Sequence, residues 1–126
     1  MSQQPNRTLI DVPEWITITD AQVSPGTEYW FLSKVEYWDD QKSRGTHHIY
    51  SKEPHDPSAK MVVSNGQEEW KVSLDKPSNE PAGNYPMWAH NRYTAWMDGM
   101  PSDRIEGMHM PAKHHVSYLL WWEKSS

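Results

Sequence analysis

The sequence predicts an all-β fold, a two-sheet antiparallel β-sandwich with about seven to nine short strands. Ten prolines and many Gly, Asn, Asp and Ser residues divide the 126-residue chain into short pieces. No stretch shows sustained helical periodicity, whereas several alternate apolar and polar residues, as half-buried strands do. The connection at 75–84 is too long for a hairpin and is expected to cross from one sheet to the other.

The clearest strand is expected at residues 27–38, after a first strand within 14–23 in which Ile16 and Ile18 alternate with more polar positions. Side chains of a strand point alternately to its two faces, and the more apolar face of 27–38 should be the core face. The opposite face, with Trp30 and Trp38 near its ends, should point outward. The predicted core face consists of Tyr29, Phe31, Ser33, Val35 and Tyr37.

The middle of the chain is predicted to contain a charged loop at 39–45, a short strand at 46–53 and a β-hairpin. Asn65 and Gly66 favour a two-residue turn in which both residues have positive φ, flanked by strand-like residues on both sides. This register pairs Ser64 with Gln67, Val63 with Glu68, Val62 with Glu69, and Met61 with Trp70.

Four further strands are expected at 85–90, 92–99, 102–110 and 114–122. Tyr93, Ala95 and Met97 share one face of the second of these. In the last, adjacent residues point to opposite faces, so its His pair and its Trp pair are each divided between the two faces. The expected core face of the last strand contains His114, Val116, Tyr118, Leu120 and Trp122, and the outer face contains His115, Ser117, Leu119 and Trp121.

The chain length suits a single domain, which we place at residues 13–124 after an N-terminal arm at 1–12. There is no Cys, so neither disulfides nor thiolate metal sites are available. The first residues lack a charged region followed by an apolar run, and we expect synthesis in a cytoplasm without a signal peptide. No segment approaches the length of a transmembrane helix.

The run "NYPMWAHNRYTAWMDGMPSDRIEGMHMPAKHHVSYLLWW", about the last third of the chain, contains a strand that ends in a "G-x-x-S-D" turn, and a last strand follows. It resembles small immunoglobulin-like or prealbumin-like accessory domains, which occur beside bacterial cell-wall hydrolases and in tailed-phage proteins. The resemblance implies a β-sandwich that binds or builds and does not catalyse. It carries over no particular glycan-contacting residue.

Catalytic and metal-binding motifs are not found, and we predict a protein that is not an enzyme and has no metal or cofactor. No strand carries two His at i, i+2 spacing, and a site from His48, His55, Asp56 and His114 or His115 would depend on the fold. The carboxylates Glu14, Asp39-Asp40 and Glu68-Glu69 stand in positions where charge is commonly just solvated. A net charge of −5 disfavours nucleic-acid and membrane partners.

Eight Trp and six Tyr accompany a single Phe, and Trp and Tyr are favoured where one side of a ring is apolar and the other polar. The preferred hypothesis is an accessory subunit that works by protein–protein contact, as a homo-oligomer or in a phage virion as a decoration, cement or tail component. Its expected contact residues are Trp30, Trp38, Trp121, Met108 and Met110.

The alternative is a carbohydrate-binding module, because sugars stack their C–H faces on aromatic rings while neighbouring polar groups bind the hydroxyls. Residues 84–93 combine aromatic rings with polar side chains. The same residues also suit an ordinary loop with Trp88 packed at the edge of the core. The residues expected to bind a glycan are Trp88, His90, Asn91, Arg92, Tyr93 and Trp96.

Overall fold

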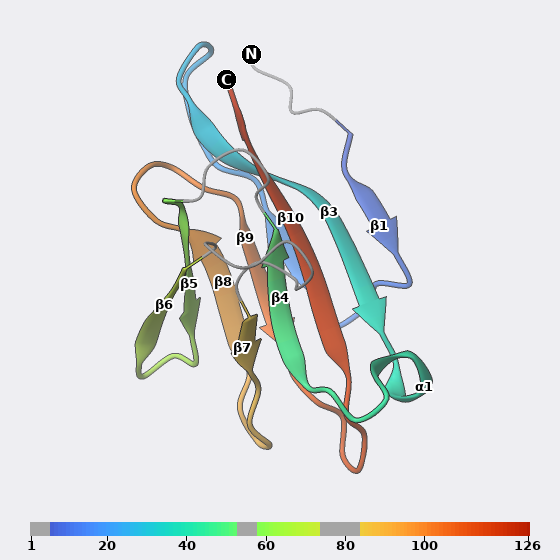
Figure 1. The fold of residues 1–126 in the computed structure, drawn as a ribbon. Helices are drawn as coiled ribbons and strands as arrows, with labels where there is room; N and C mark the ends of the chain where they lie inside the picture. The colour runs from blue at the N-terminus through green and yellow to red at the C-terminus, as the bar shows by residue number, and fades with distance from the viewer. Residues whose placement is uncertain (1–5, 53–57, 74–83) are drawn as a thin grey trace.

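The computed structural model describes residues 6–52, 58–73 and 84–126, and it confirms a two-sheet β-sandwich (Figure 1). The described residues form ten strands, one more than the predicted range. Sheet A contains, in spatial order, β1 (Thr8–Ile10), β3 (Tyr29–Trp38), β10 (Ser117–Ser125), β4 (His48–Lys52) and β7 (Asn84–Pro86). Sheet B contains β2 (Thr17–Thr19), β9 (Arg104–Met108), β8 (Tyr93–Met97), β5 (Lys60–Ser64) and β6 (Glu69–Ser73).

Two pairs in sheet A are parallel, which departs from the fully antiparallel prediction. β1 lies parallel to β3, and β4 lies parallel to β10, whereas all pairs of sheet B are antiparallel. β1 falls inside the stretch predicted as an N-terminal arm. The boundary at residue 12 is therefore wrong, because Thr8–Ile10 already belongs to the sandwich.

A β-bulge in β3 explains why the predicted faces of this strand are only partly right. Trp121 of β10 pairs with Lys34 and Trp122 pairs with Leu32, so Ser33 has no partner residue. The extra residue exchanges the two faces from that point on. Val35 and Tyr37 therefore face sheet B as predicted, whereas before the bulge Leu32 and Trp30 do so.

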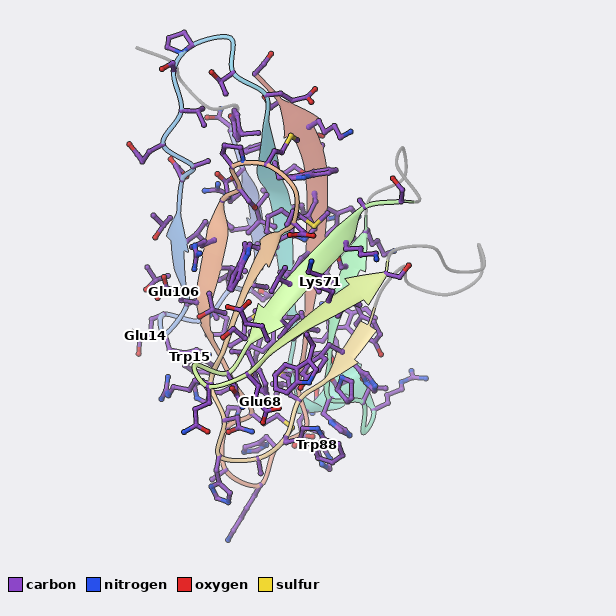
Figure 2. The ribbon with its side chains drawn as sticks, turned by 90° about the vertical axis from the view of Figure 1, so that its left-hand side faces the viewer. Glu14, Trp15, Glu68, Lys71, Trp88 and Glu106 are labelled. Atoms are coloured by element: carbon purple, nitrogen blue, oxygen red, sulfur yellow. The ribbon has the colours of Figure 1, made fainter. Side chains whose placement is uncertain are left out.

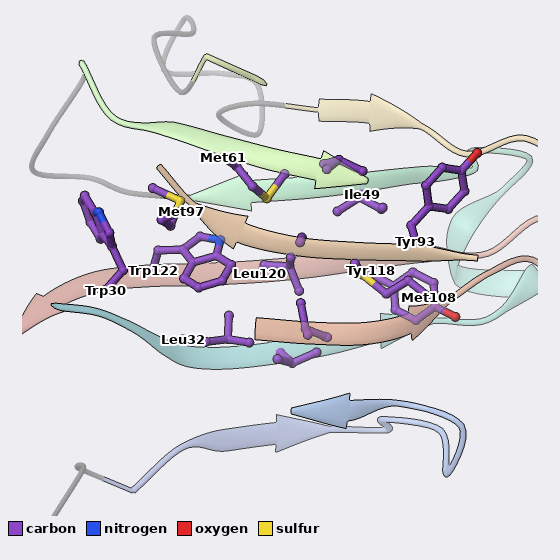
Figure 3. Packing of buried hydrophobic residues seen from close by; sticks show 14 of the residues in the cluster. Trp30, Leu32, Ile49, Met61, Tyr93, Met97, Met108, Tyr118, Leu120 and Trp122 are labelled. Carbon is purple, nitrogen blue, oxygen red and sulfur yellow. The ribbon is translucent and has the colours of Figure 1, made fainter. Parts of the chain in front are cut away.

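The core lies between the two sheets (Figure 3). Most residues of the two best-predicted faces are buried, including Phe31, Val35, Val116, Tyr118 and Leu120. Ser33 and Tyr37 are only half-buried, and His114, which precedes β10, is exposed. Phe31 lies outside the main cluster, and Arg7 is stacked over its ring at 5.4 Å. The cluster includes Trp30, Leu32, Ile49, Met61, Tyr93, Met97, Met108, Tyr118, Leu120 and Trp122.

The β5–β6 hairpin forms with a different register from the predicted one. Ser64 pairs with Glu69, and Val63 pairs with Trp70, so each partner is displaced by two residues and the faces are retained. Of the two residues predicted to have positive φ, Gly66 does, at 91°, and Asn65 does not. The Asn65 side-chain oxygen accepts the backbone N–H groups of Gln67 and Glu68. The Asn65 N–H donates to the Glu68 carbonyl, so the two central residues of the turn are Gly66 and Gln67.

Other elements differ in length from the prediction. The first expected strand shortens to β2, and the loop at 39–45 contains the one-turn helix α1 (Asp40–Ser43). The Asp39 side chain caps this turn by accepting the Lys42 N–H at 3.1 Å, a common role of Asp at a helix start. β6 belongs to sheet B and β7 to sheet A, as the expected crossover requires, although most of 75–84 lies outside the described residues.

Candidate binding site on the outer face of sheet A

One end of the sandwich gathers the histidines that the structure describes. His47 directly precedes β4 and His48 begins it, His90 lies between β7 and β8, and His109, His114 and His115 lie between β9 and β10. The start of β4 adjoins the start of β10 and the end of β7, so these segments meet at one end, next to α1 in Figure 1. The remaining histidine, His55, is outside the described residues.

Three of these imidazoles are in contact. The ring of His47 stacks on that of His48 with centroids 5.2 Å apart, and its centroid lies 5.4 Å from that of His115. His47 Nδ1 lies 2.8 Å from the Met87 carbonyl oxygen, which can only accept, so Nδ1 carries the proton. Stacked rings do not aim their nitrogens at one point, and no set of three His, Cys, Asp or Glu among the described residues could hold a metal.

The histidines continue a row of aromatic rings, here called the ring strip: Trp38, Tyr50, His48, His47 and Trp88. Ring centroids are 6.3 Å apart between Trp38 and Tyr50, and 5.4 Å apart between Tyr50 and His48. Those of His47 and Trp88 are 6.1 Å apart. The strip runs from the outer face of sheet A to Trp88, which is 61% exposed and projects at the end of the molecule in Figure 2.

The strand register extends this surface along β10. Trp121 lies level with Lys34 of β3 and Lys52 of β4. The Lys34 and Lys52 Nζ atoms are 4.4 Å and 5.3 Å from the centroid of the Trp121 ring, within the range of cation–π attraction. Between Trp121 and the ring strip, the buried Leu119 fills the middle of the face.

His48 is the most constrained member of the strip. Burial lowers the pKa of its imidazole, and the neighbouring His47 lowers the pKa further, because both disfavour the charged form. Its Nδ1 is buried without a hydrogen-bond partner among the described residues. His48 therefore contributes a neutral, flat ring to the strip.

A hollow at the same end lies between α1 and the β9–β10 connection, lined by Tyr37, Asp39, Asp40 and His114 among others. The hydrogen bond from His114 lowers the pKa of Asp40, with 2.7 Å between His114 Nδ1 and Asp40 Oδ2. Burial, and then the nearby Tyr118, raises the pKa of Tyr37 to about 12. Asp39 caps α1 and Asp40 is bound to His114, so these groups hold the local structure of this end.

The residues predicted to bind a glycan are divided by the structure. Trp88, His90, Asn91 and Arg92 lie together in the turn before β8. Tyr93 is fully buried, and its hydroxyl accepts the Trp88 N–H at 2.9 Å, so it supports the turn and cannot contact a ligand.

Trp96 lies apart from that turn on the outer face of sheet B, where Arg104 stacks over its ring at 4.2 Å. Figure 2 faces this side of the molecule and shows Glu106 of β9 there. Glu14, Glu68 and Glu69 are all exposed, in agreement with their interpretation as solvated charges.

Two of the predicted assembly contacts are wrong. Trp30 is 3% exposed and Met108 is fully buried, because the bulge in β3 turns Trp30 inward and Met108 ends β9 on its inner face. Met110 is half-buried against the core. Trp38 and Trp121 do lie on the outer face of sheet A.

Sequence reasoning missed His47, His48 and Tyr50 as ring-bearing neighbours, and Lys34 and Lys52 as companions of Trp121. The alternation in "HHIYSK" places His48, Tyr50 and Lys52 on one face and was a usable signal. Comparison with protein-family models, curated proteins and solved structures finds no match to this chain. No helix in the described ranges is long and apolar enough to cross a membrane.

Proposed function

We propose that this chain is a non-catalytic carbohydrate-binding module that holds a glycan along the ring strip of sheet A. The observation that carries the proposal is the continuity of the rings from Trp38 through Tyr50, His48 and His47 to Trp88. Five rings with neighbouring centroids 5.2–6.3 Å apart form one continuous aromatic surface on sheet A, along which an extended polymer with repeated C–H faces can lie.

Polar groups on the same face supply the hydrogen bonds that a sugar requires. Glu36 accepts the Trp38 Nε1–H at 2.8 Å, which fixes the indole and leaves further carboxylate lone pairs for hydroxyl groups. Lys34 and Lys52 provide donors beside Trp121. A few polar groups placed among rings are the usual composition of a ligand site.

Assembly through protein–protein contact, including a place in a phage virion, is the second candidate. The outer location of Trp38 and Trp121 favours it. Stable interfaces, however, have cores depleted in charge, whereas Lys34, Glu36 and Lys52 are interleaved with the rings on this face. Among the described residues the exposed large hydrophobics are only Leu9 and Trp88, and β1 carries the first of these.

Retention on a panel of polysaccharides tests the proposal. Wild-type protein is compared with Trp38→Ala and Trp88→Ala, and with Trp96→Ala on the opposite sheet as a control that removes the same side chain. A contact Trp is typically worth about 2 kcal/mol or more, so the two strip variants should bind at least ~10-fold more weakly. The control should bind as the wild type does.

Light scattering on the same proteins tests the second candidate. A wild-type oligomer that Trp38→Ala dissociates, together with no retention on any polysaccharide, would replace the glycan proposal by assembly. Equal loss of retention in all three variants would contradict a site on sheet A.

A further inference from the structure

We infer that the glycan held along the ring strip is anionic, and that Lys34 and Lys52 receive its carboxylate, sulfate or phosphate groups on either side of Trp121. This inference rests on the proposed function and specifies the chemical class of its ligand.

The two lysines come from different strands and meet at one ring. Lys34 of β3 and Lys52 of β4 flank Trp121 of the central strand β10 at the same level. Their Nζ atoms lie 4.4 Å and 5.3 Å from the centroid of that ring. Both ammonium groups lie over the Trp121 ring, so the anionic groups of a sugar that passes this ring would meet an ammonium group from each neighbouring strand.

No carboxylate of the described residues lies within ion-pair distance of either lysine, whereas Lys71 on the outer face of sheet B pairs with Asp98 at 3.2 Å. Glu36 is two residues from Lys34 on the same face, but its carboxylate accepts the Trp38 Nε1–H. The ammonium groups thus retain donors for a charged partner, and charge-assisted hydrogen bonds are stronger than neutral ones.

A nucleic acid is a poorer fit for the same surface. Binding to nucleic acid requires neutralisation of several phosphates by an extended basic footprint. Here two lysines stand on a chain whose net charge is −5. Two local cations beside a row of rings match a polymer with widely spaced charges, as in an acidic polysaccharide.

Matched polymers provide the test. Polygalacturonate is compared with its methyl ester, and dextran sulfate with dextran, so that each pair differs in charge and shares a backbone. The carboxylate pair and the sulfate pair also distinguish between the two kinds of anionic group. Wild-type protein should bind at least one anionic polymer ~10-fold or more tightly than its neutral counterpart, as expected for two charge-assisted contacts, and added salt should weaken this preference.

The double variant Lys34→Gln/Lys52→Gln should lose the preference for the anionic polymer. Lys60→Gln/Lys71→Gln changes the net charge equally but acts on sheet B, and it should retain the preference. Lys34→Arg/Lys52→Arg keeps both charges and should retain it as well, which guards against loss of binding through misfolding. Circular dichroism and melting curves verify that each variant is folded.

The possible failures are distinguishable. Equal binding of charged and neutral polymers, with loss in Trp88→Ala, overturns the anionic ligand and leaves the glycan-binding proposal intact. Equal loss in the two Gln double variants shows nonspecific charge attraction and overturns the role of Lys34 and Lys52. Tighter binding of single-stranded DNA than of any polysaccharide, or no binding to any polymer, overturns both proposals.

Discussion

Arg7 and Asp103, separated by 96 residues in the chain, form an ion pair with 2.9 Å between Arg7 Nη2 and Asp103 Oδ2. Asp103 is fully buried. Its Oδ2 also accepts the Leu32 N–H, and its Oδ1 accepts the Ala21 N–H, both at 2.8 Å. One carboxylate therefore connects the N-terminal segment, the chain before β3 and β3 itself.

The same residue completes the "G-x-x-S-D" turn on which the resemblance to accessory domains depends. The Asp103 N–H donates to the Trp30 carbonyl at 3.0 Å, and the Trp30 N–H donates to the Pro101 carbonyl at 2.8 Å. Ser102 Oγ accepts the Met97 N–H at 2.9 Å. The turn thus fastens the end of β8 to β3, a structural role that leaves none of these groups on the ring strip.

Asp103→Ala should destabilise the fold severely. It leaves Arg7 without its buried partner and two backbone N–H groups without acceptors, and breaking a buried pair costs about 3–5 kcal/mol. Asp20→Ala removes a half-exposed partner of Arg7 and should cost less than about 1 kcal/mol. Urea unfolding of both variants measures the difference, and equal costs would disprove the central role of Asp103.

Gly107→Ala should be more harmful than Gly66→Ala, although the two glycines have nearly the same φ, 92° and 91°. A left-handed conformation costs a residue with a Cβ about 1–2 kcal/mol, and both variants incur this cost. A Cβ at Gly107 would also lie 2.3 Å from the Trp15 carbonyl oxygen, whereas Gly66 faces open space. Melting temperatures should separate the variants, and matching values would contradict this geometry.

Leu120→Ala should cost about 2–5 kcal/mol of unfolding free energy, as large-to-small changes in a packed core do. Leu120 is fully buried, as the alternation of the last strand predicted. The control is Leu9→Ala, which removes the same atoms from a side chain that is 54% exposed and should change stability by less than about 0.5 kcal/mol. Chemical denaturation of both variants gives the comparison.

The alternation of apolar residues predicts the inner face correctly for β10 and only partly for β3. The alternation from Val116 to Trp122 predicts the inner face of β10, because every second residue is apolar and the core lies on one side. In β3 the same rule fails at Ser33, where a β-bulge places an extra residue opposite β10. Nothing in the sequence indicates a bulge at this position. The inward position of Trp30 follows from the pairing with β10, which is a long-range contact.

The candidate site was foreseeable only in parts, for the same reason. Trp38, Trp88 and Trp121 are conspicuous in the sequence, but whether they share a surface depends on which strands are neighbours. The parallel pairing of β4 with β10 places Tyr50 and Lys52 beside Leu119 and Trp121. Local spacing predicts the face on which a residue lies, and it cannot predict the neighbouring strand.

Acidification should lower the free energy of unfolding through the protonation of His48. Because its folded-state pKa is lowered below the ordinary value of 6.5 by burial and by His47, the unfolded chain binds a proton before the folded chain does. The free energy of unfolding therefore falls as pH decreases from the unfolded pKa toward the folded one. Above the unfolded pKa this contribution is constant.

Urea unfolding at about pH 7.5 and about pH 5.5, on either side of the ordinary histidine range, measures the effect in wild type, His48→Gln and His90→Gln. The effect of the lowered pKa of Asp40 is present in all three proteins and cancels in the comparison. His48→Gln should lose less stability on acidification than wild type, whereas His90→Gln, changed at an exposed turn, should follow the wild-type profile. Coinciding profiles of wild type and His48→Gln would mean that His48 binds its proton equally well in both states, contrary to its buried position in the ring strip.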